Sequence, residues 1–259
     1  MLSKNKIKLI RSLEQKKYRR VYNMFVAEGT KLIEDLLKTL RCKYLIATNE
    51  WINNNQPLAS KLATQHIEMD NATEDELKKV SFLKTPQDIL AVFEIPQHDE
   101  IGKIISKDQL YIALDGVQDP GNLGTIIRIA DWFGIEDVFC SNDTVDVYNP
   151  KTVQATMGAL ARVKVHYVDL PEILNEAAHN DIPIYGTFLD GENMYEGAQL
   201  SQNGIIVMGN EGNGICCEVE QIVNRKLFIP NYPIGRPTSE SLNVAIATAI
   251  ICAEFRRKK

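Results

Sequence analysis

The sequence of 259 residues has few of the features that indicate a metalloprotein, a disulfide-bonded protein or a membrane protein. Its five cysteines include an adjacent pair and show no metal-ligand spacing, so we interpret them as buried thiols. The four histidines are isolated from one another and from the cysteines, and we therefore predict no metal. The longest apolar stretch, Val244 to Ala253, is too short to span a bilayer.

The N-terminus lacks the continuous apolar segment of a signal peptide, because four basic residues interrupt its first eleven positions. We therefore expect a cytoplasmic protein with no membrane segment. An overall positive charge, which is common in nucleic-acid-binding proteins, is also missing, since the net charge is −5. Residues 1–20 nevertheless contain eight cations against one acid, a pattern typical of either a solvated basic helix or a nucleic-acid contact.

The length favours two domains. The sequence of the first domain predicts a small α/β unit. Its expected elements are a basic helix over residues 1–20, a loop to Phe25, a helix from Thr30, a strand Lys43 to Ala47, a helix that the capping box Thr73 and Glu76 starts, and a buried strand Ile89 to Phe93. Residues 97–107 are polar and have no apolar period, so we expect them to link a domain of residues 1–96 to one of residues 108–259.

Beyond this linker, apolar strands alternate with helices, which predicts a mostly parallel sheet covered on both faces. The expected strands are Tyr111–Leu114, Asp137–Cys140, Lys164–Tyr167, Ile184–Thr187, Ile205–Met208 and Lys226–Ile229. The expected helices are Asn122–Phe133, Pro150–Val163, Pro171–Asn180 and Ser239–Arg256.

Three segments of the second domain carry unusual polar patterns. Residues 119–122 (Asp-Pro-Gly-Asn) form a turn sequence before a helix that Asn122 is suited to cap, and Arg128 lies off the apolar stripe of this helix, as most surface arginines do. Residues 209–214 (Gly-Asn-Glu-Gly-Asn-Gly) follow a strand but match neither a dinucleotide fingerprint nor a P-loop, so they fit a tight turn or a close approach to a flat ligand. Residues 241–243 (Ser-Leu-Asn) precede an apolar helix that must be buried.

In this order and with these spacings, the three segments resemble motifs 1, 2 and 3 of the SpoU/TrmH branch of the SPOUT RNA methyltransferases. Residues 25–29 resemble the Phe-x-x-Glu-Gly signature of the L30e-like domain that precedes the catalytic domain in many members. The resemblance implies an α/β fold, in which a C-terminal SPOUT domain with a mostly parallel sheet and a trefoil knot follows a small L30e-like substrate-binding domain. It also implies S-adenosylmethionine as the cofactor and a homodimer.

The resemblance further implies roles for individual residues. Arg128 is expected to act in catalysis with Asn122 buttressing it, Asn243 to order the pocket, and Glu211 either to take part in proton removal or to anchor an RNA or backbone donor. The residues expected to bind S-adenosylmethionine are Thr187, Met208, Gly209, Ile229, Ser241 and Leu242. The residues expected to contact RNA are Lys4, Lys8, Arg11, Lys16, Lys17, Arg19 and Arg20.

The expected reaction is methyl transfer to a ribose 2′-hydroxyl of structured RNA, with ribosomal RNA favoured over transfer RNA. A non-catalytic RNA-binding or ribosome-assembly protein of the same fold is an alternative, and a nucleotide-dependent oxidoreductase is disfavoured by the missing fingerprint. The chain departs from the family pattern at Asn231, which replaces the usual Met after Ile-Pro, in a ten-residue link to Ser241. Arg236 in this link fits either a substrate contact or a solvent-exposed loop residue.

Overall fold

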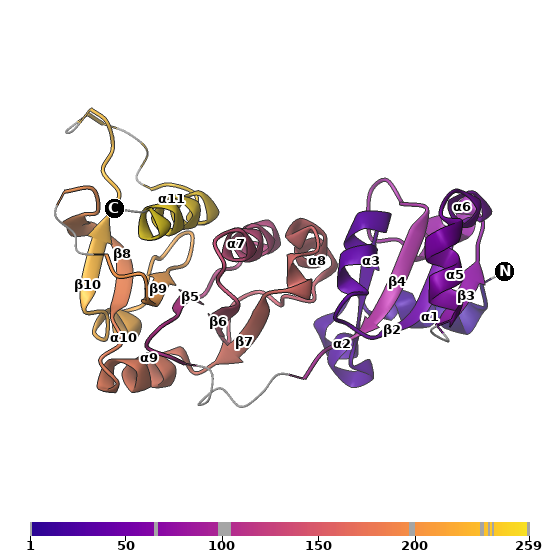
Figure 1. Ribbon diagram of the computed structural model, residues 1–259, viewed down its shortest axis with the longest axis horizontal. Coiled ribbons are helices and arrows are strands. Elements are labelled where there is room, and N and C mark those ends of the chain that lie inside the picture. Colours follow the sequence, from indigo (N-terminus) through magenta and orange to yellow (C-terminus); the bar gives the residue numbers. More distant parts are fainter. Residues whose placement is uncertain are drawn as a thin grey trace. The chain divides into compact units, whose positions relative to one another are not determined.

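The computed structural model describes residues 2–64, 67–97, 105–196, 200–233, 236, 237, 239 and 241–257. The chain forms two compact units (Figure 1). The first consists of Met1–Gln97 and Asp146–Ala161, and the second of His98–Val145 and Arg162–Lys259. Each unit contains its own β-sheet. None of the described helices is long and apolar enough to cross a membrane.

The sheet of the first unit has the strand order β1-β4-β2-β3, in which β4 is antiparallel to both neighbours and β3 is parallel to β2. Its strands are β1 (Met24–Glu28), β2 (Cys42–Ala47), β3 (Glu68–Asn71) and β4 (Ile89–Glu94). The helices of this unit are α1 (Lys4–Ser12), α2 (Lys16–Tyr22), α3 (Thr30–Leu36), α4 (Asn49–Asn54), α5 (Gln56–Thr64), α6 (Glu74–Val80), α8 (Pro150–Thr156) and the 3₁₀-helix η2 (Ala159–Ala161).

The first sheet is buried on both faces. Successive side chains of a strand point to opposite faces, so Phe25 of β1 packs with α3 while the next residue, Val26, packs against α1 and α6. The capping box of Thr73 and Glu76 at the start of α6 is confirmed, because each side chain hydrogen-bonds to the backbone of the other residue.

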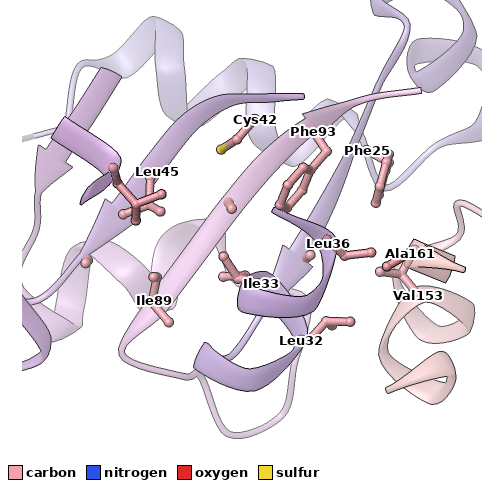
Figure 2. Packing of buried hydrophobic residues seen from close by; sticks show 14 of the residues in the cluster. Phe25, Leu32, Ile33, Leu36, Cys42, Leu45, Ile89, Phe93, Val153 and Ala161 are labelled. Carbon is pink, nitrogen blue, oxygen red and sulfur yellow. The ribbon is translucent and has the colours of Figure 1, made fainter. Parts of the chain in front are cut away.

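A segment from the middle of the second predicted domain completes the core of the first unit. Val153 of α8 and Ala161 of η2 are buried beside Phe25 and Leu36 (Figure 2). The ring of Tyr148 lies 4.8 Å from the ring of Phe25, centroid to centroid. Residues 1–97 therefore do not form this core alone, since part of it comes from residues 146–161.

The prediction of one basic helix over residues 1–20 is wrong, because the chain turns between α1 and α2. Leu13 at the turn is fully buried in the core. The guanidinium of Arg19 donates hydrogen bonds to the carbonyl oxygens of Leu13 (2.8 Å) and Glu14 (2.7 Å), which a continuous helix would use for its own backbone. The strands β1 and β3 and the helices α4 and α5 were not predicted.

The sheet of the second unit has the strand order β10-β8-β9-β5-β6-β7, and every pair in it is parallel. Its strands are β5 (Leu110–Leu114), β6 (Asp137–Ser141), β7 (Lys164–Val168), β8 (Ile184–Asn193), β9 (Gly204–Met208) and β10 (Arg225–Phe228). Its helices are α7 (Pro120–Trp132), α9 (Leu170–His179), α10 (Cys217–Glu220) and α11 (Val244–Arg256). The predicted parallel sheet is confirmed.

Helices cover both faces of this sheet, as predicted. Ile184 of β8 packs in a cluster with α9 and α10. The next residue, Tyr185, points to the other face, where its ring contacts Phe255 of α11 edge-on at 4.8 Å between centroids. The helices α7 and α11 pack against each other, so the residues before each helix lie within reach of one another.

Three predicted helix boundaries are wrong for identifiable reasons. The helix expected over residues 150–163 ends at Thr156, because Met157 and Gly158 have positive φ angles of 51° and 94°. The last helix begins at Val244 rather than Ser239, since the side chain of Asn243 caps it. Helix α7 begins at Pro120 and is capped by Asp119 instead of Asn122. The predicted linker falls largely on residues 98–104, which lie outside the described residues.

Candidate active site

The carboxyl ends of parallel strands meet at one edge of a sheet, and this edge of the second unit carries the polar motifs. Residues 115–119 follow β5, residues 209–214 follow β9, and Ile229 follows β10. Thr187 lies where β8 leaves its pairing with β10, since Gly186 pairs with Lys226 but the next pair joins Glu192 to Leu227. The loops after β5, β9 and β10 and Thr187 of β8 thus lie on neighbouring strands of the sheet.

The loop after β9 closes on itself and requires a glycine at its first position. A Cβ atom on Gly209 would lie 2.2 Å from the carbonyl carbon of Gly214, which is far below any normal contact. The backbone groups of Asn210 and Gly214 exchange two hydrogen bonds of 2.9 and 3.0 Å. The side chain of Asn210 also accepts hydrogen bonds from the backbone of Gly212 and Asn213. Gly209 therefore allows the loop to turn back directly after the buried Met208.

Glu211 fastens this loop to the segment that follows β5. One carboxylate oxygen of Glu211 accepts a hydrogen bond from the backbone N–H of Gln118 at 3.1 Å. The other accepts from the N–H of Asp119 at 3.1 Å and from the Asn122 side-chain amide at 3.0 Å. Partial burial acts to raise the pKa of Glu211, but the hydrogen bonds from Asn122, its own backbone, Gln118 and Asp119 together lower it below its ordinary value. Glu211 is therefore ionised at neutral pH.

Asn122 connects Glu211 to the third motif. Its amide nitrogen donates to Glu211, and its side-chain oxygen accepts a hydrogen bond of 2.9 Å from the amide of Asn243. The oxygen of Asn243 in turn accepts from the N–H groups of Ala245 and Ile246 at the start of α11. In the described part of the chain, Asn122 bonds to these two residues and not directly to Arg128. A chain of side-chain hydrogen bonds instead joins all three motifs.

The loop after β6 holds the first motif from its other side. The hydroxyl of Ser141 accepts a hydrogen bond of 2.8 Å from the N–H of Gly116, and the amide of Gln118 donates to the carbonyl oxygen of Asp143 at 2.7 Å. Buried Asp115 accepts a hydrogen bond of 2.7 Å from the N–H of Cys216, beyond the glycine-rich loop. None of these anchors was predicted from the sequence. Asp115 could have been identified, because it is a polar residue directly after a buried strand.

Arg128 lies two turns into α7, and its side chain is exposed. Within the described part of the chain, no group forms a hydrogen bond or an ion pair with its guanidinium. The guanidinium is always charged and presents several N–H donors in one plane, an arrangement that suits a phosphate or a developing oxyanion. The prediction that Arg128 lies off the buried stripe of its helix is confirmed, since Ile127 and Ala130 are fully buried.

The predicted cofactor residues differ in their exposure. Met208 is buried. Thr187 within β8, Gly209 after β9 and Ile229 after β10 are half-buried, whereas Ser241 and Leu242 are exposed. Leu242 directly precedes Asn243, and the Asn243 amide is bonded to Asn122. The amide of Asn231 donates a hydrogen bond of 3.0 Å to the carbonyl oxygen of Arg236.

The sequence matches known families over both units. Residues 109–253 match the SpoU rRNA Methylase family. The chain belongs to this family. Residues 4–91 match the MRM3-like substrate binding domain. The 23S rRNA (guanosine(2553)-2'-O)-methyltransferase RlmP of Bacillus subtilis is 32% identical over 97% of this chain and 96% of its own length.

Solved structures agree with this membership in the SpoU family. A TrmH-family protein from Porphyromonas gingivalis superposes with a TM-score of 0.86 and 41% identity, covering 99% of this chain and 98% of that chain. The AdoMet-bound rRNA methyltransferase from Sinorhizobium meliloti has a TM-score of 0.85 and 29% identity, covering 99% of this chain and 95% of that chain. The segment 146–161, which packs in the first unit, lies inside the SpoU match in sequence.

The basic residues of the first unit do not all face solvent. Arg19 is 2% exposed and donates two hydrogen bonds to one carboxylate oxygen of Asp146, at 2.9 and 2.5 Å. The prediction that it contacts RNA is therefore wrong. Arg11 is exposed but donates to the carbonyl oxygen of Ser81 at 2.9 Å. The side chains of the other predicted RNA contacts are exposed, namely Lys4, Lys8, Lys16, Lys17 and Arg20.

Proposed function

We propose that this protein transfers the methyl group of S-adenosylmethionine to a ribose 2′-hydroxyl of ribosomal RNA. The observation that carries the proposal is the hydrogen-bond chain Glu211–Asn122–Asn243, which brings three distant motifs together at the carboxyl edge of a parallel sheet. Two relatives that match almost the whole chain are named as rRNA methyltransferases, which favours ribosomal RNA over transfer RNA.

The residues at this edge fit the proposed cofactor. Adenosine is a flat ligand that needs apolar contacts and backbone hydrogen-bonding groups. Met208 and Ile229 supply the apolar contacts, the half-buried Gly209 supplies backbone groups, and the half-buried Thr187 supplies a hydroxyl. When bound, S-adenosylmethionine supplies an electrophilic methyl group. Ser241 and Leu242 complete the proposed binding residues, next to the Asn243 that is bonded to the first motif.

Arg128 is the proposed catalytic residue. Its exposed guanidinium, which has no partner among the described residues, is available to bind the phosphate beside the acceptor ribose and to stabilise the charge that develops on the 2′-oxygen. One such charged hydrogen bond contributes about 1.5 to 3 kcal/mol. A guanidinium carries only N–H donors and is always charged, so Arg128 acts as an electrostatic group rather than as a general base.

Glu211, Asn122 and Asn243 are proposed to position the site rather than to move the proton. Both carboxylate oxygens of Glu211 already accept hydrogen bonds, and its lowered pKa makes it a weak base. Asn122 uses both ends of its amide to join Glu211 to Asn243. Proper alignment of two bound reactants can lower a barrier by about 7 to 11 kcal/mol, and a rigid clasp between motifs serves that alignment.

A methyl-transfer assay tests the proposal directly. The purified chain is incubated with methyl-labelled S-adenosylmethionine and unmethylated 23S rRNA transcript, and 2′-O-methyl positions are then mapped. We expect label at a ribose of the transcript and none on transfer RNA. Binding of the transcript without any methyl transfer would favour the non-catalytic RNA-binding or ribosome-assembly function instead.

We propose a homodimer formed through α7 and α11. Trp132 of α7 is 85% exposed and Ile246 of α11 is 53% exposed, although both are large apolar side chains. Such exposure on two helices that pack together supports a subunit interface. Sedimentation of the wild-type chain should give a dimer, and Trp132→Arg should shift it toward the monomer. A wild-type monomer at micromolar concentration would contradict the dimer.

Three finer features are proposed on the basis of the family. The first unit is proposed to be the L30e-like substrate-binding domain, with domain boundaries at residues 1–96 and 108–259 and a linker at 97–107. The chain after β10 is proposed to form the trefoil knot, which its return from the sheet edge to α7 supports. A cytoplasmic location follows from a ribosomal RNA substrate.

An experimental backbone trace tests the knot, and cell fractionation tests the location.

A further inference from the structure

The short helix α2 presents an unusual surface for a protein of net negative charge. Five of its side chains face solvent, of which three are cationic and two, Val21 and Tyr22, are 65% and 44% exposed. No acidic residue lies in this helix. Adjacent exposed apolar side chains with polar groups around them are a common feature of binding surfaces. We call this surface the α2 platform, consisting of Lys16, Lys17, Tyr18, Arg20, Val21 and Tyr22.

Helical geometry separates the α2 platform into two adjacent strips. With 3.6 residues per turn, Lys16, Lys17 and Arg20 share one side of the helix, while Tyr18, Val21 and Tyr22 share the side next to it. The rings of Tyr18 and Tyr22 are nearly parallel, with an interplanar angle of 17° and centroids 6.2 Å apart. The platform therefore offers a row of cations beside a row of apolar and aromatic groups.

The remaining side chain of α2 anchors the helix. Arg19 points away from solvent and is held by Asp146 and by the carbonyl oxygens of Leu13 and Glu14. Because these contacts fix the helix from its buried side, the exposed strips are held in a defined orientation. An anchored aromatic pair loses little conformational freedom when it binds a ligand.

We propose that the α2 platform binds an unpaired nucleotide of the RNA substrate, with its base stacked on Tyr22 and Tyr18 and its phosphate beside Lys17 and Arg20. This inference rests on the proposed RNA function and adds the chemistry of recognition to it. The cationic strip matches the charge of a phosphate backbone, and the aromatic strip matches the face of a base. In a duplex the base faces are covered by stacking, so the platform selects single-stranded segments.

Binding of the full-length chain to two probes tests the α2 platform. The probes are a fluorescein-labelled single-stranded oligoadenylate and a fully paired RNA duplex of the same length, followed by fluorescence anisotropy. Tyr22→Ala should weaken binding to the single strand roughly 5- to 150-fold, the range for losing one stacked base, and leave duplex binding unchanged. Tyr22→Trp should restore the affinity for the single strand. Tyr195→Ala, which removes a 50% exposed tyrosine of the second unit, is the matched control and should leave both affinities unchanged.

The cationic strip has a different expected signature. Lys17→Gln combined with Arg20→Gln should weaken binding to both probes. The slope of log affinity against log salt concentration should become less steep by about 0.7 for each lost phosphate contact with the single strand. Tyr22→Ala should leave this slope unchanged. If Tyr22→Ala binds the single strand as well as the wild type does, the proposed stacking on the α2 platform is overturned. That result would instead favour an acidic protein as the partner of α2. Wild-type methyl transfer to rRNA is measured in parallel, so that a failed platform is distinguished from a failed methyltransferase assignment.

Discussion

The two units each use a glutamate to fasten a loop, and the difference in burial gives these glutamates opposite ionisation behaviour. Glu28 of the first unit is 4% exposed and accepts hydrogen bonds from the Ser81 hydroxyl at 2.5 Å and from the Phe82 N–H at 2.7 Å. Burial raises its pKa despite these bonds. Glu211 lies at the open edge of the second unit, and its hydrogen bonds lower its pKa.

The arginines of the two units show the same contrast. Arg19 is enclosed and paired with Asp146, whereas Arg128 is exposed and has no partner in the described part of the chain. Polar groups enclosed in the first unit thus stabilise the fold, while those at the edge of the second unit remain accessible to a ligand. This comparison predicts that substitutions in the first group change stability and that substitutions in the second group change turnover.

The largest effect is expected for Arg19→Ala. Removing one partner of a buried ion pair leaves Asp146, whose side chain is 13% exposed, without its counter-charge, and costs about 3 to 5 kcal/mol of unfolding free energy. Urea unfolding measures this loss. The neighbouring exposed Arg20→Ala is the matched control and should stay within about 0.5 kcal/mol of the wild type. Equal stability of both variants would show that the enclosed Arg19 does not stabilise the fold of the first unit.

Arg128→Ala is expected to lower turnover by roughly 10²- to 10³-fold, the usual loss of one group that stabilises developing charge. Its unfolding free energy should stay within about 0.5 kcal/mol of the wild type, because the side chain is exposed and has no hydrogen bond or ion pair within the described residues. Calorimetry should show retained affinity for S-adenosylmethionine. Arg225→Ala, an exposed arginine at the amino end of β10, serves as the control with normal turnover. Near-normal turnover of Arg128→Ala would reject its catalytic role.

Glu211→Gln is expected to lower kcat/KM roughly 10- to 100-fold, because it replaces charged hydrogen bonds that are each worth about 1.5 to 3 kcal/mol. The neutral amide can accept with only one of its two ends, so the contacts with Gln118, Asp119 and Asn122 cannot all persist. Steady-state methyl transfer measures the effect. Glu218→Gln removes an exposed charge nearby and should retain full activity. An unaffected Glu211→Gln enzyme would show that the clasp is dispensable.

The smallest effects concern the pH dependence of stability, where the two glutamates should differ in sign. The raised pKa of Glu28 means that its contribution to stability is present below its ordinary value of 4.5 and is lost as the pH rises through its folded pKa. The lowered pKa of Glu211 means that its contribution is present above 4.5 and is lost as the pH falls through its folded pKa.

Urea unfolding across this pH range tests the two signs with matched variants. The stability advantage of the wild type over Glu28→Gln should shrink as the pH rises above about 4.5, and its advantage over Glu211→Gln should shrink as the pH falls below it. If the difference in unfolding free energy from the wild type changes in the same direction with pH for both variants, the contrast in burial does not govern the ionisation of these carboxylates.

The parallel sheet was predictable because its strands are continuous apolar runs bounded by turn residues, and each of the six expected strands is present. The first unit was less predictable. The edge strand β3 consists of Glu68, Met69, Asp70 and Asn71, which have no apolar alternation for a pattern to detect. The N-cap of α7 was also predictable, because Asp119 is directly followed by Pro120 and Pro is common at the first position of a helix. The prediction of Asn122 as the N-cap overlooked this pattern.

Local sequence by itself determined the strands of the second unit, several of the helices, the motifs and the family, because hydrophobic periodicity and turn chemistry act over a few neighbouring residues. Tertiary structure alone decided which polar groups are enclosed and which are accessible. Nothing in the sequence near Arg19 shows that Asp146 will cover it, or that Val153 will complete a core more than a hundred residues away. Burial depends on contacts between distant residues, and burial decides whether a charged side chain serves the fold or remains available for function.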